Sequence, residues 1–130
     1  MKFLCLGYYD AERMDSRPKS EIEAVMSQCM PRLDEFYGTG QVLLDAGLEV
    51  EARSVHSVDG AIRVADGRAA KTNATIGSVS VIEARDMEDA IRVASKHPSP
   101  SVEAGEAFGW IMEIRPIHTF RQPSRGDGER

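Results

Sequence analysis

The side chains that can exchange protons near neutral pH are three histidines, His56, His97 and His118. They share no metal-ligand spacing, and the sequence contains no zinc-binding helix motif, phosphate-binding glycine loop or serine nucleophile elbow. We therefore predict neither a metal site nor a cofactor. His56 is the candidate acid–base residue, with Asp45 as the carboxylate to test beside it, although an exposed strand position explains His56 equally well. His97 comes just before Pro98 at a predicted helix end, which favours a structural role.

A second candidate site is a pair of opposite charges near the end of the chain. Glu113 and Arg115 lie on the same face of a predicted strand. A carboxylate inside a protein needs a charged partner, and a guanidinium forms a planar two-pronged pair with it. The pair either orients a sheet or dimer interface, which we favour, or clamps a substrate.

Composition and charge limit the classes of function. The chain has 130 residues, of which 42% are hydrophobic and 28% charged, as in a soluble single domain. Its net charge of −5 and pI near 5.2 oppose nucleic-acid binding, which needs a basic face. No apolar run approaches the roughly 18 residues of a membrane span, and the apolar start is too short for a signal peptide. With Cys5 and Cys29 read as reduced core residues, we expect a cytoplasmic protein.

Hydrophobic patterns predict six strands and two helices. The strands cover residues 2–9, 41–45, 52–58, 61–65, 76–84 and 110–117, the helices cover 20–37 and 86–97, and residues 10–19 and 99–109 are loops. Asp59-Gly60 predicts a tight turn between the third and fourth strands, which form an appendage at the sheet edge.

Local signals define the two helices. Ser20 and Glu23 have capping-box spacing, and Pro31 predicts a kink in the first helix. Asp86 caps the second helix and Pro98 ends it. An apolar stripe on each helix is expected to face the core: Ile22, Val25, Met26, Cys29, Leu33, Phe36 and Tyr37 on the first, and Met87, Ala90, Ile91 and Ala94 on the second.

The order of these elements is β-α-β, a hairpin, then β-α-β, which predicts an α+β sandwich of ferredoxin-like type. Such a sheet leaves one face bare, yet the strand at residues 2–9 is apolar on both sides. We therefore expect a homodimer that stacks two sheets face to face, forming a dimeric α+β barrel. Residues 1–120 are predicted to form one domain and residues 121–130 a disordered tail.

Short motifs spread along most of the chain carry a family resemblance. They are MKFLCL at residues 1–6, the turn Asp66-Gly67, IEARDMEDAI at 82–91, the stop His97-Pro98 and EIRPI at 113–117. With these motifs the chain resembles the YCII-related family, in the branch named for the motif Asp-Gly-Pro-Phe (DGPF). The resemblance implies a dimeric α+β barrel and a link to extracytoplasmic-function sigma factors or stress response. It also implies a His–Asp pair, which some relatives use but which finds no close match in this chain.

The chain departs from the family at the motif itself. Arg68 and Ala69 replace the proline and phenylalanine that follow Asp66-Gly67, and Lys71 replaces a nearby glutamate. If this loop shapes a pocket in relatives, the pocket here has lost an aromatic wall and gained positive charge. Arg68 and Lys71 therefore join Glu113 and Arg115 as candidate binding residues.

Two classes of function follow from the sequence. One is a non-catalytic protein that binds a small molecule or regulates a partner such as a sigma factor. The other is an enzyme that uses acid–base chemistry in a cleft at the dimer interface. We favour the first, because the sequence forces no acid, base or nucleophile. A closed apolar pocket on which Glu113, Arg115 or His56 converged would favour a ligand site.

Overall fold

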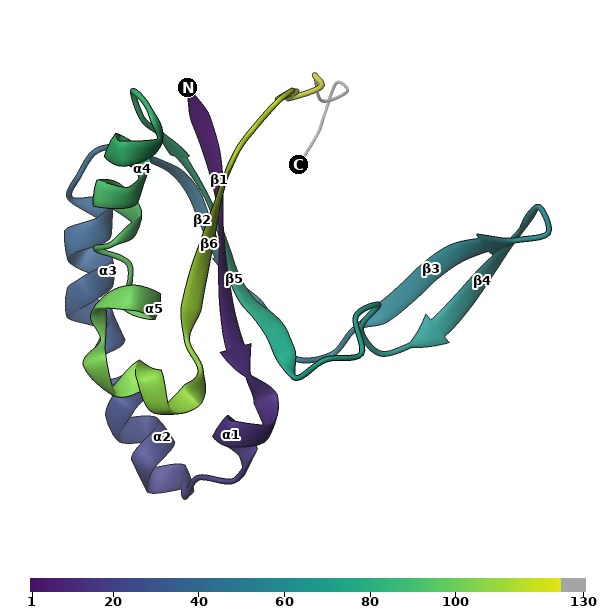
Figure 1. The fold of residues 1–130 in the computed structure, drawn as a ribbon, viewed down its shortest axis with the longest axis horizontal. Helices are drawn as coiled ribbons and strands as arrows, with labels where there is room; N and C mark the ends of the chain where they lie inside the picture. The colour runs from purple at the N-terminus through teal and green to yellow at the C-terminus, as the bar shows by residue number, and fades with distance from the viewer. Residues whose placement is uncertain (125–130) are drawn as a thin grey trace.

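The computed structural model describes residues 1–124 and has six strands packed with short helices (Figure 1). In chain order the elements are β1 (Lys2–Asp10), α1 (Ala11–Asp15), α2 (Lys19–Met26), α3 (Cys29–Tyr37), β2 (Val42–Gly47), β3 (Arg53–Val58), β4 (Ala61–Asp66), β5 (Ala74–Glu83), α4 (Met87–Ala94), α5 (Pro98–Ser101), the 3-10 helix η1 (Glu103–Phe108) and β6 (Ile111–Pro116). The predicted strands are therefore present, with small shifts at their ends.

Four strands form the main sheet in the order β2-β5-β1-β6, and all neighbours are antiparallel. Each of the two crossovers, from β1 to β2 and from β5 to β6, runs through helices. This arrangement is the split β-α-β pattern of a ferredoxin-like sheet. The α+β prediction is confirmed, whereas the dimeric barrel stays a prediction.

The helices lie on one side of this sheet only (Figure 1). On that side Phe3, Cys5 and Ile82 are fully buried against Phe36 of α3 and Val93 of α4. Large apolar side chains buried in this way contribute about 1.5–3 kcal/mol each. Burial also raises the pKa of the Cys5 thiol to about 11, which keeps it unreactive at neutral pH.

Among the described residues, no helix or strand covers the other face of the sheet, which we call the open face. Alternation along β1 sends Phe3 and Cys5 into the core and leaves Leu4, Leu6 and Tyr8 half-buried on the far side. One face of β1 is therefore covered by helices and the other is not, and the covering of that second face by another copy stays a prediction.

A buried carboxylate fixes α4 to the sheet. Asp86 caps the helix as predicted, accepting the backbone N–H of Asp89 at 2.8 Å. The buried Asp89 carboxylate accepts the N–H of Arg85 at 3.0 Å, the guanidinium of Arg92 at 2.9 Å and the amide of Gln41 at 3.2 Å. The Arg85 N–H, as the largest cause, and the Arg92 guanidinium hold the pKa of Asp89 far below its ordinary value. Since Gln41 directly precedes β2, this network ties the start of α4 to the edge of the sheet.

The predicted helix at residues 20–37 is two helices. The break falls at Ser27 and Gln28, and Pro31 lies in the first turn of α3, where backbone N–H groups have no intrahelical partner. The capping box is wrong as well, because the helix starts one residue before Ser20, with Pro18 at the N-cap. Within the predicted stripes Val25, Phe36, Ala90 and Ala94 are buried, whereas Met26, Tyr37, Met87 and Ile91 are exposed.

The two predicted loops contain short helices. Residues 10–19 include α1, and residues 99–109 include most of α5 and η1. Around them Val25, Val102 and Phe108 form a second buried cluster, which Trp110 also contacts. Trp110 packs directly on Gly105, where a Cβ would lie 2.2 Å from the indole ring, so only glycine fits there.

Strands β3 and β4 form a separate two-stranded sheet that projects away from the rest of the molecule (Figure 1). We call this hairpin, residues 53–66, the arm. Its turn is the predicted one, because Asp59 and Gly60 both have positive φ, at 51° and 79°.

The end of the described chain has no helix or strand after β6. Lys2 lies over the ring of Phe120, 5.2 Å from its centroid. Of the predicted tail at 121–130, residues 125–130 lie outside the described residues. Within residues 1–124, no helix combines the length and apolar character that crossing a membrane requires.

Candidate functional site

The clearest polar cluster lies where α3 meets strand β2. Tyr37, the last residue of α3, donates its phenol to Asp45 Oδ2, and Ser80 Oγ donates to Asp45 Oδ1 at 2.7 Å. Asp45 and Ser80 are partners in the β2–β5 register, on the face that the helices cover. The two strands thus place the carboxylate and the hydroxyl side by side, and the end of α3 brings the phenol to them.

His97 is buried near this cluster, only 6% exposed, between the end of α4 and the start of α5. Its ring packs edge-on against Phe36, with the ring centroids 5.1 Å apart. Its Nδ1 accepts the backbone N–H of Ser99 at 3.0 Å, which makes His97 the N-cap of α5. A neutral imidazole that accepts at Nδ1 carries its proton on Nε2. A structural role at a helix end is what the sequence predicts for His97, but the end differs. The helix predicted to run to residue 97 stops at Ala94, and His97 and Pro98 begin α5 instead.

The surroundings of the cluster favour the uncharged forms of both Tyr37 and His97. The hydrogen bond to Asp45 raises the pKa of Tyr37 to about 12, and burial and the carboxylate charge add to the effect. Burial lowers the pKa of His97 below its ordinary value, and the charge of Asp45 opposes that shift. Near neutral pH the cluster therefore holds a phenol, a neutral imidazole and one carboxylate.

The geometry of the cluster suits a structural role, holding helices against the sheet, better than proton transfer to a substrate. Both Asp45 oxygens accept a hydrogen bond, the Tyr37 phenol donates one, and Nδ1 of His97 is engaged with the backbone. A general base needs a free lone pair aimed at a substrate proton. As arranged, the Tyr37–Asp45 hydrogen bond fastens α3 to the sheet, and His97 packs the start of α5 against Phe36 of α3.

The structure does not bring His56 to Asp45. His56 lies in the middle of the arm, opposite Arg63 of the paired strand, whereas Asp45 belongs to the main sheet. The arm points away from that sheet (Figure 1). A pairing of these two residues within one chain therefore has no geometric support.

Glu113 and Arg115 do meet, on the open face of the sheet. Arg115 Nη1 lies 3.7 Å from Glu113 Oε2, and both side chains are largely exposed. In the sheet register Arg115 stands opposite Leu4 and Glu113 opposite Leu6. An exposed pair at this distance contributes little to stability, so both groups remain available to other partners.

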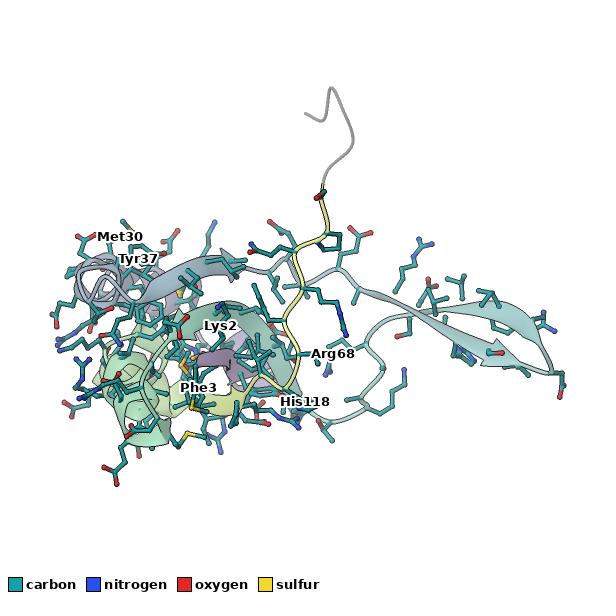
Figure 2. All side chains as sticks on the ribbon, turned by 90° about the horizontal axis from the view of Figure 1, so that it is seen from above. Lys2, Phe3, Met30, Tyr37, Arg68 and His118 are labelled. Atoms are coloured by element: carbon teal, nitrogen blue, oxygen red, sulfur yellow. The ribbon has the colours of Figure 1, made fainter. Side chains whose placement is uncertain are left out.

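Arg68 and Lys71 donate hydrogen bonds to backbone carbonyls close to them in the chain. Arg68 donates to the carbonyls of Thr72 at 2.8 Å and Ala74 at 3.0 Å, and Lys71 donates to the carbonyl of Arg68 at 3.0 Å. Figure 2 shows Arg68 near the arm, far from Tyr37 at the helical end of the molecule. Neither basic side chain approaches the Asp45 cluster.

Hollows on the described surface lie elsewhere. Two open hollows of about 590 Å³ each border η1 and share Glu103 and Glu106. None of the predicted site residues lines either one. Within residues 1–124, no three side chains of His, Cys, Asp or Glu gather in a way that would hold a metal ion.

Sequence reasoning missed Tyr37 and Ser80 as partners of Asp45. Ser80 offered a signal, since it is a polar residue in a strand whose neighbours Val79, Val81 and Ile82 are apolar, and a buried hydroxyl needs a partner. Tyr37 gave no such signal, because its position in the apolar stripe of the first predicted helix indicates a core residue.

Comparison with protein families confirms the YCII-related resemblance. Residues 1–119 match the family model of the YCII-related domain. No curated protein matches the chain.

The Tyr37–Asp45 hydrogen bond predicts a late-ionising phenol. Of the three tyrosines, Tyr37 should ionise near pH 12 in the folded protein, as measured by phenolate absorbance immediately after a pH jump. Asp45→Asn should move this ionisation to lower pH, because the negative charge is lost. Tyr37→Phe should abolish it, and Tyr9→Phe should leave it in place. An unchanged late phase in Tyr37→Phe would contradict the assignment.

The burial of His97 predicts a dependence of stability on pH. In the unfolded chain His97 gains a proton near pH 6.5, whereas in the folded protein it resists protonation. The free energy of unfolding should therefore fall as pH drops below about 6.5, and the contribution should be complete above that pH. Asp89 adds its own loss only at more acidic pH, below its ordinary value of 3.8.

Urea denaturation of His97→Asn tests this dependence, because asparagine still caps α5 but does not titrate. The fall between pH 6.5 and 5 should disappear in His97→Asn and persist in His118→Asn, a change at an exposed histidine. Equal slopes in the wild type and His97→Asn would show that another group is responsible.

Proposed function

The chain belongs to the YCII-related domain family, and on that basis we propose that it is a homodimeric binding protein. Its ligand cleft lies where the open sheet faces of two copies stack. This arrangement is the dimeric α+β barrel that the resemblance implies.

The open sheet face is the observation that carries the proposal. Apolar side chains from all four strands form its centre. Among them Leu44 is 46% exposed, Ile76 37% and Ile111 63%. Registers place the following side chains on this face: Leu4, Leu6, Tyr8, Leu44, Ala46, Ile76, Val79, Val81 and Ile111. An apolar surface this continuous on a water-soluble chain is typical of an interface.

A second copy is the simplest cover for this face. Two sheets stack about 10 Å apart with side chains interdigitating, and a twofold axis lets the same apolar patch serve both copies. A stable interface needs about 800 Å² from each partner, which a four-stranded sheet can supply.

The charged pair on this face indicates the chemistry of the ligand. Glu113 and Arg115 sit beside the apolar centre, and their mutual contact is long and exposed. A carboxylate or similar anion can form the shorter two-pronged pair with Arg115 that Glu113 does not form. The ligand class is therefore a small molecule with an apolar body and one anionic group.

An acid–base enzyme is the second candidate, because Tyr37 and His97 lie near Asp45. It ranks lower, since both Asp45 oxygens and Nδ1 of His97 already accept hydrogen bonds from within the chain. The regulatory link to a sigma factor, the DGPF branch and a cytoplasmic location remain separate predictions from the resemblance and composition.

The dimer predicts a specific effect of charge on the open face. Leu6→Glu should raise the dissociation constant by about a thousandfold, since two leucines at about 2 kcal/mol each leave the interface. Sedimentation velocity over a concentration series measures the shift. Ile91→Glu is the matched control, because Ile91 is an exposed aliphatic residue on the helical side. A wild-type chain that remained monomeric at micromolar concentration would refute the proposal.

The ligand site predicts stabilisation by small amphipathic carboxylates in a thermal-shift screen. A ligand that binds only the folded dimer raises the melting temperature by mass action. Arg115→Gln should abolish the shift, whereas Glu113→Gln should preserve or increase it, because it frees the guanidinium. Equal shifts in the wild type and Arg115→Gln would exclude this site.

A further inference from the structure

The arm forms a sheet of its own, separate from the four-stranded sheet. Within residues 1–124, β3 and β4 pair only with each other, and the arm joins the rest through its base. There Gly67 N–H donates to the carbonyl of Ala52 at 2.9 Å, and Ser54 Oγ donates to the carbonyl of Gly67 at 2.8 Å. An isolated two-stranded hairpin is marginally stable in water, so the arm needs another surface.

Three β-branched side chains share one face of the arm, which also carries the Arg53–Asp66 ion pair at its base. The opposite face is polar in its middle and has Val58 and Ala61 beside the turn. Paired residues in an antiparallel register point to the same side, which groups Val55 with Val64 and, one pair further along that side, with Ile62. These three β-branched side chains are 64%, 63% and 69% exposed. His56 and Arg63 occupy the opposite face. The arm therefore has a defined side to bury.

The direction of the arm identifies what covers it. The helices lie on one side of the main sheet, and the arm leaves on the other, the side of the open face (Figure 1). A second copy stacked on that face necessarily lies beside the arm. At about 3.3 Å per residue, strands of six residues extend about 20 Å, twice the spacing of two stacked sheets.

The charge of the arm also fits a second copy. Residues 53–66 carry two arginines, Arg53 and Arg63, and two aspartates, Asp59 and Asp66, so the arm adds no net charge. The whole chain carries −5. A neutral arm with an apolar side can approach such a copy without like-charge repulsion.

We propose that the arm is an exchanged clasp, in which each copy packs Val55, Ile62 and Val64 against the other. The inference rests on the proposed dimer and adds that the arm, following β2 directly, walls one side of the cleft between the sheets. The ligand site of each dimer is then incomplete without the arms of both copies.

The test compares the two faces of the arm. A triple variant, Val55→Thr with Ile62→Thr and Val64→Thr, keeps strand-favouring residues while removing apolar surface. The dissociation constant from sedimentation velocity should rise by about a hundredfold or more, since six side chains per dimer are affected. The control, His56→Thr with Arg63→Thr, should leave it within about twofold. An unchanged dissociation constant in the triple variant overturns the clasp.

Hydrogen exchange gives a second readout that does not depend on variants. In the wild-type dimer, arm amides in residues 53–66 should be protected, and dilution below the dissociation constant should remove that protection. Arm amides that exchange freely in an intact dimer would refute the clasp and leave sheet stacking in place; a different protein would then be the partner of the arm. A chain that is monomeric throughout would instead remove the dimer on which both proposals rest.

A second variant replaces residues 53–66 by a short Gly-Ser linker, which keeps the test valid if the triple variant misfolds. In the described part of the chain the arm pairs with no other strand, so the four-stranded sheet should keep its circular dichroism spectrum and cooperative unfolding. This variant should dimerise as weakly as the triple variant. Dimerisation as tight as the wild type would overturn the clasp.

Discussion

The helices of this chain cover only one face of its four-stranded sheet, and the other features follow from that asymmetry. Alternation along β1 sends Phe3 and Cys5 into the core and leaves Leu4 and Leu6 on the far side. The buried face supplies the hydrophobic stabilisation of the single chain. The open face has a similar apolar character, but within residues 1–124 no helix or strand covers it, which is why we propose a second copy as its cover.

The edge strand β2 is where the helix layer is fastened to this sheet. Gln41, just before the strand, donates to Asp89 of α4, and Asp45 within the strand accepts from Tyr37 of α3. Both carboxylates have several donors, which is the condition for keeping a charge at low exposure. Since the arm follows β2 along the chain, the same contacts fix the position from which it projects.

Local signals made much of the fold predictable. The alternation of the strands, the Asp59-Gly60 turn and the Asp86 cap depend on residues close in sequence, and the structure has all three. The break at Ser27 and the helices at 98–108 depend on packing around Phe108 and Trp110, which no local pattern reveals. The partners of Asp45 are equally hidden, because the β2–β5 register and the end of α3 bring them together. His56 was paired with Asp45 from residue type alone, and the arm carries it away from the sheet.

The two proposed functions, an acid–base enzyme and a ligand-binding protein, differ in whether their polar side chains already have strong partners within the chain. The Asp45 cluster has the residue types of an acid–base site, but its hydrogen bonds are internal, because they tie α3 to the sheet and cap α5. Glu113 and Arg115 have the opposite character, since their mutual contact is weak and they stand beside exposed apolar side chains. Stacking a second sheet on this face would lower the local dielectric and strengthen any ion pair that Arg115 forms there. This contrast is the reason for placing the proposed ligand site on the open face, where Arg115 can still gain a shorter ion pair and the apolar side chains can still be buried.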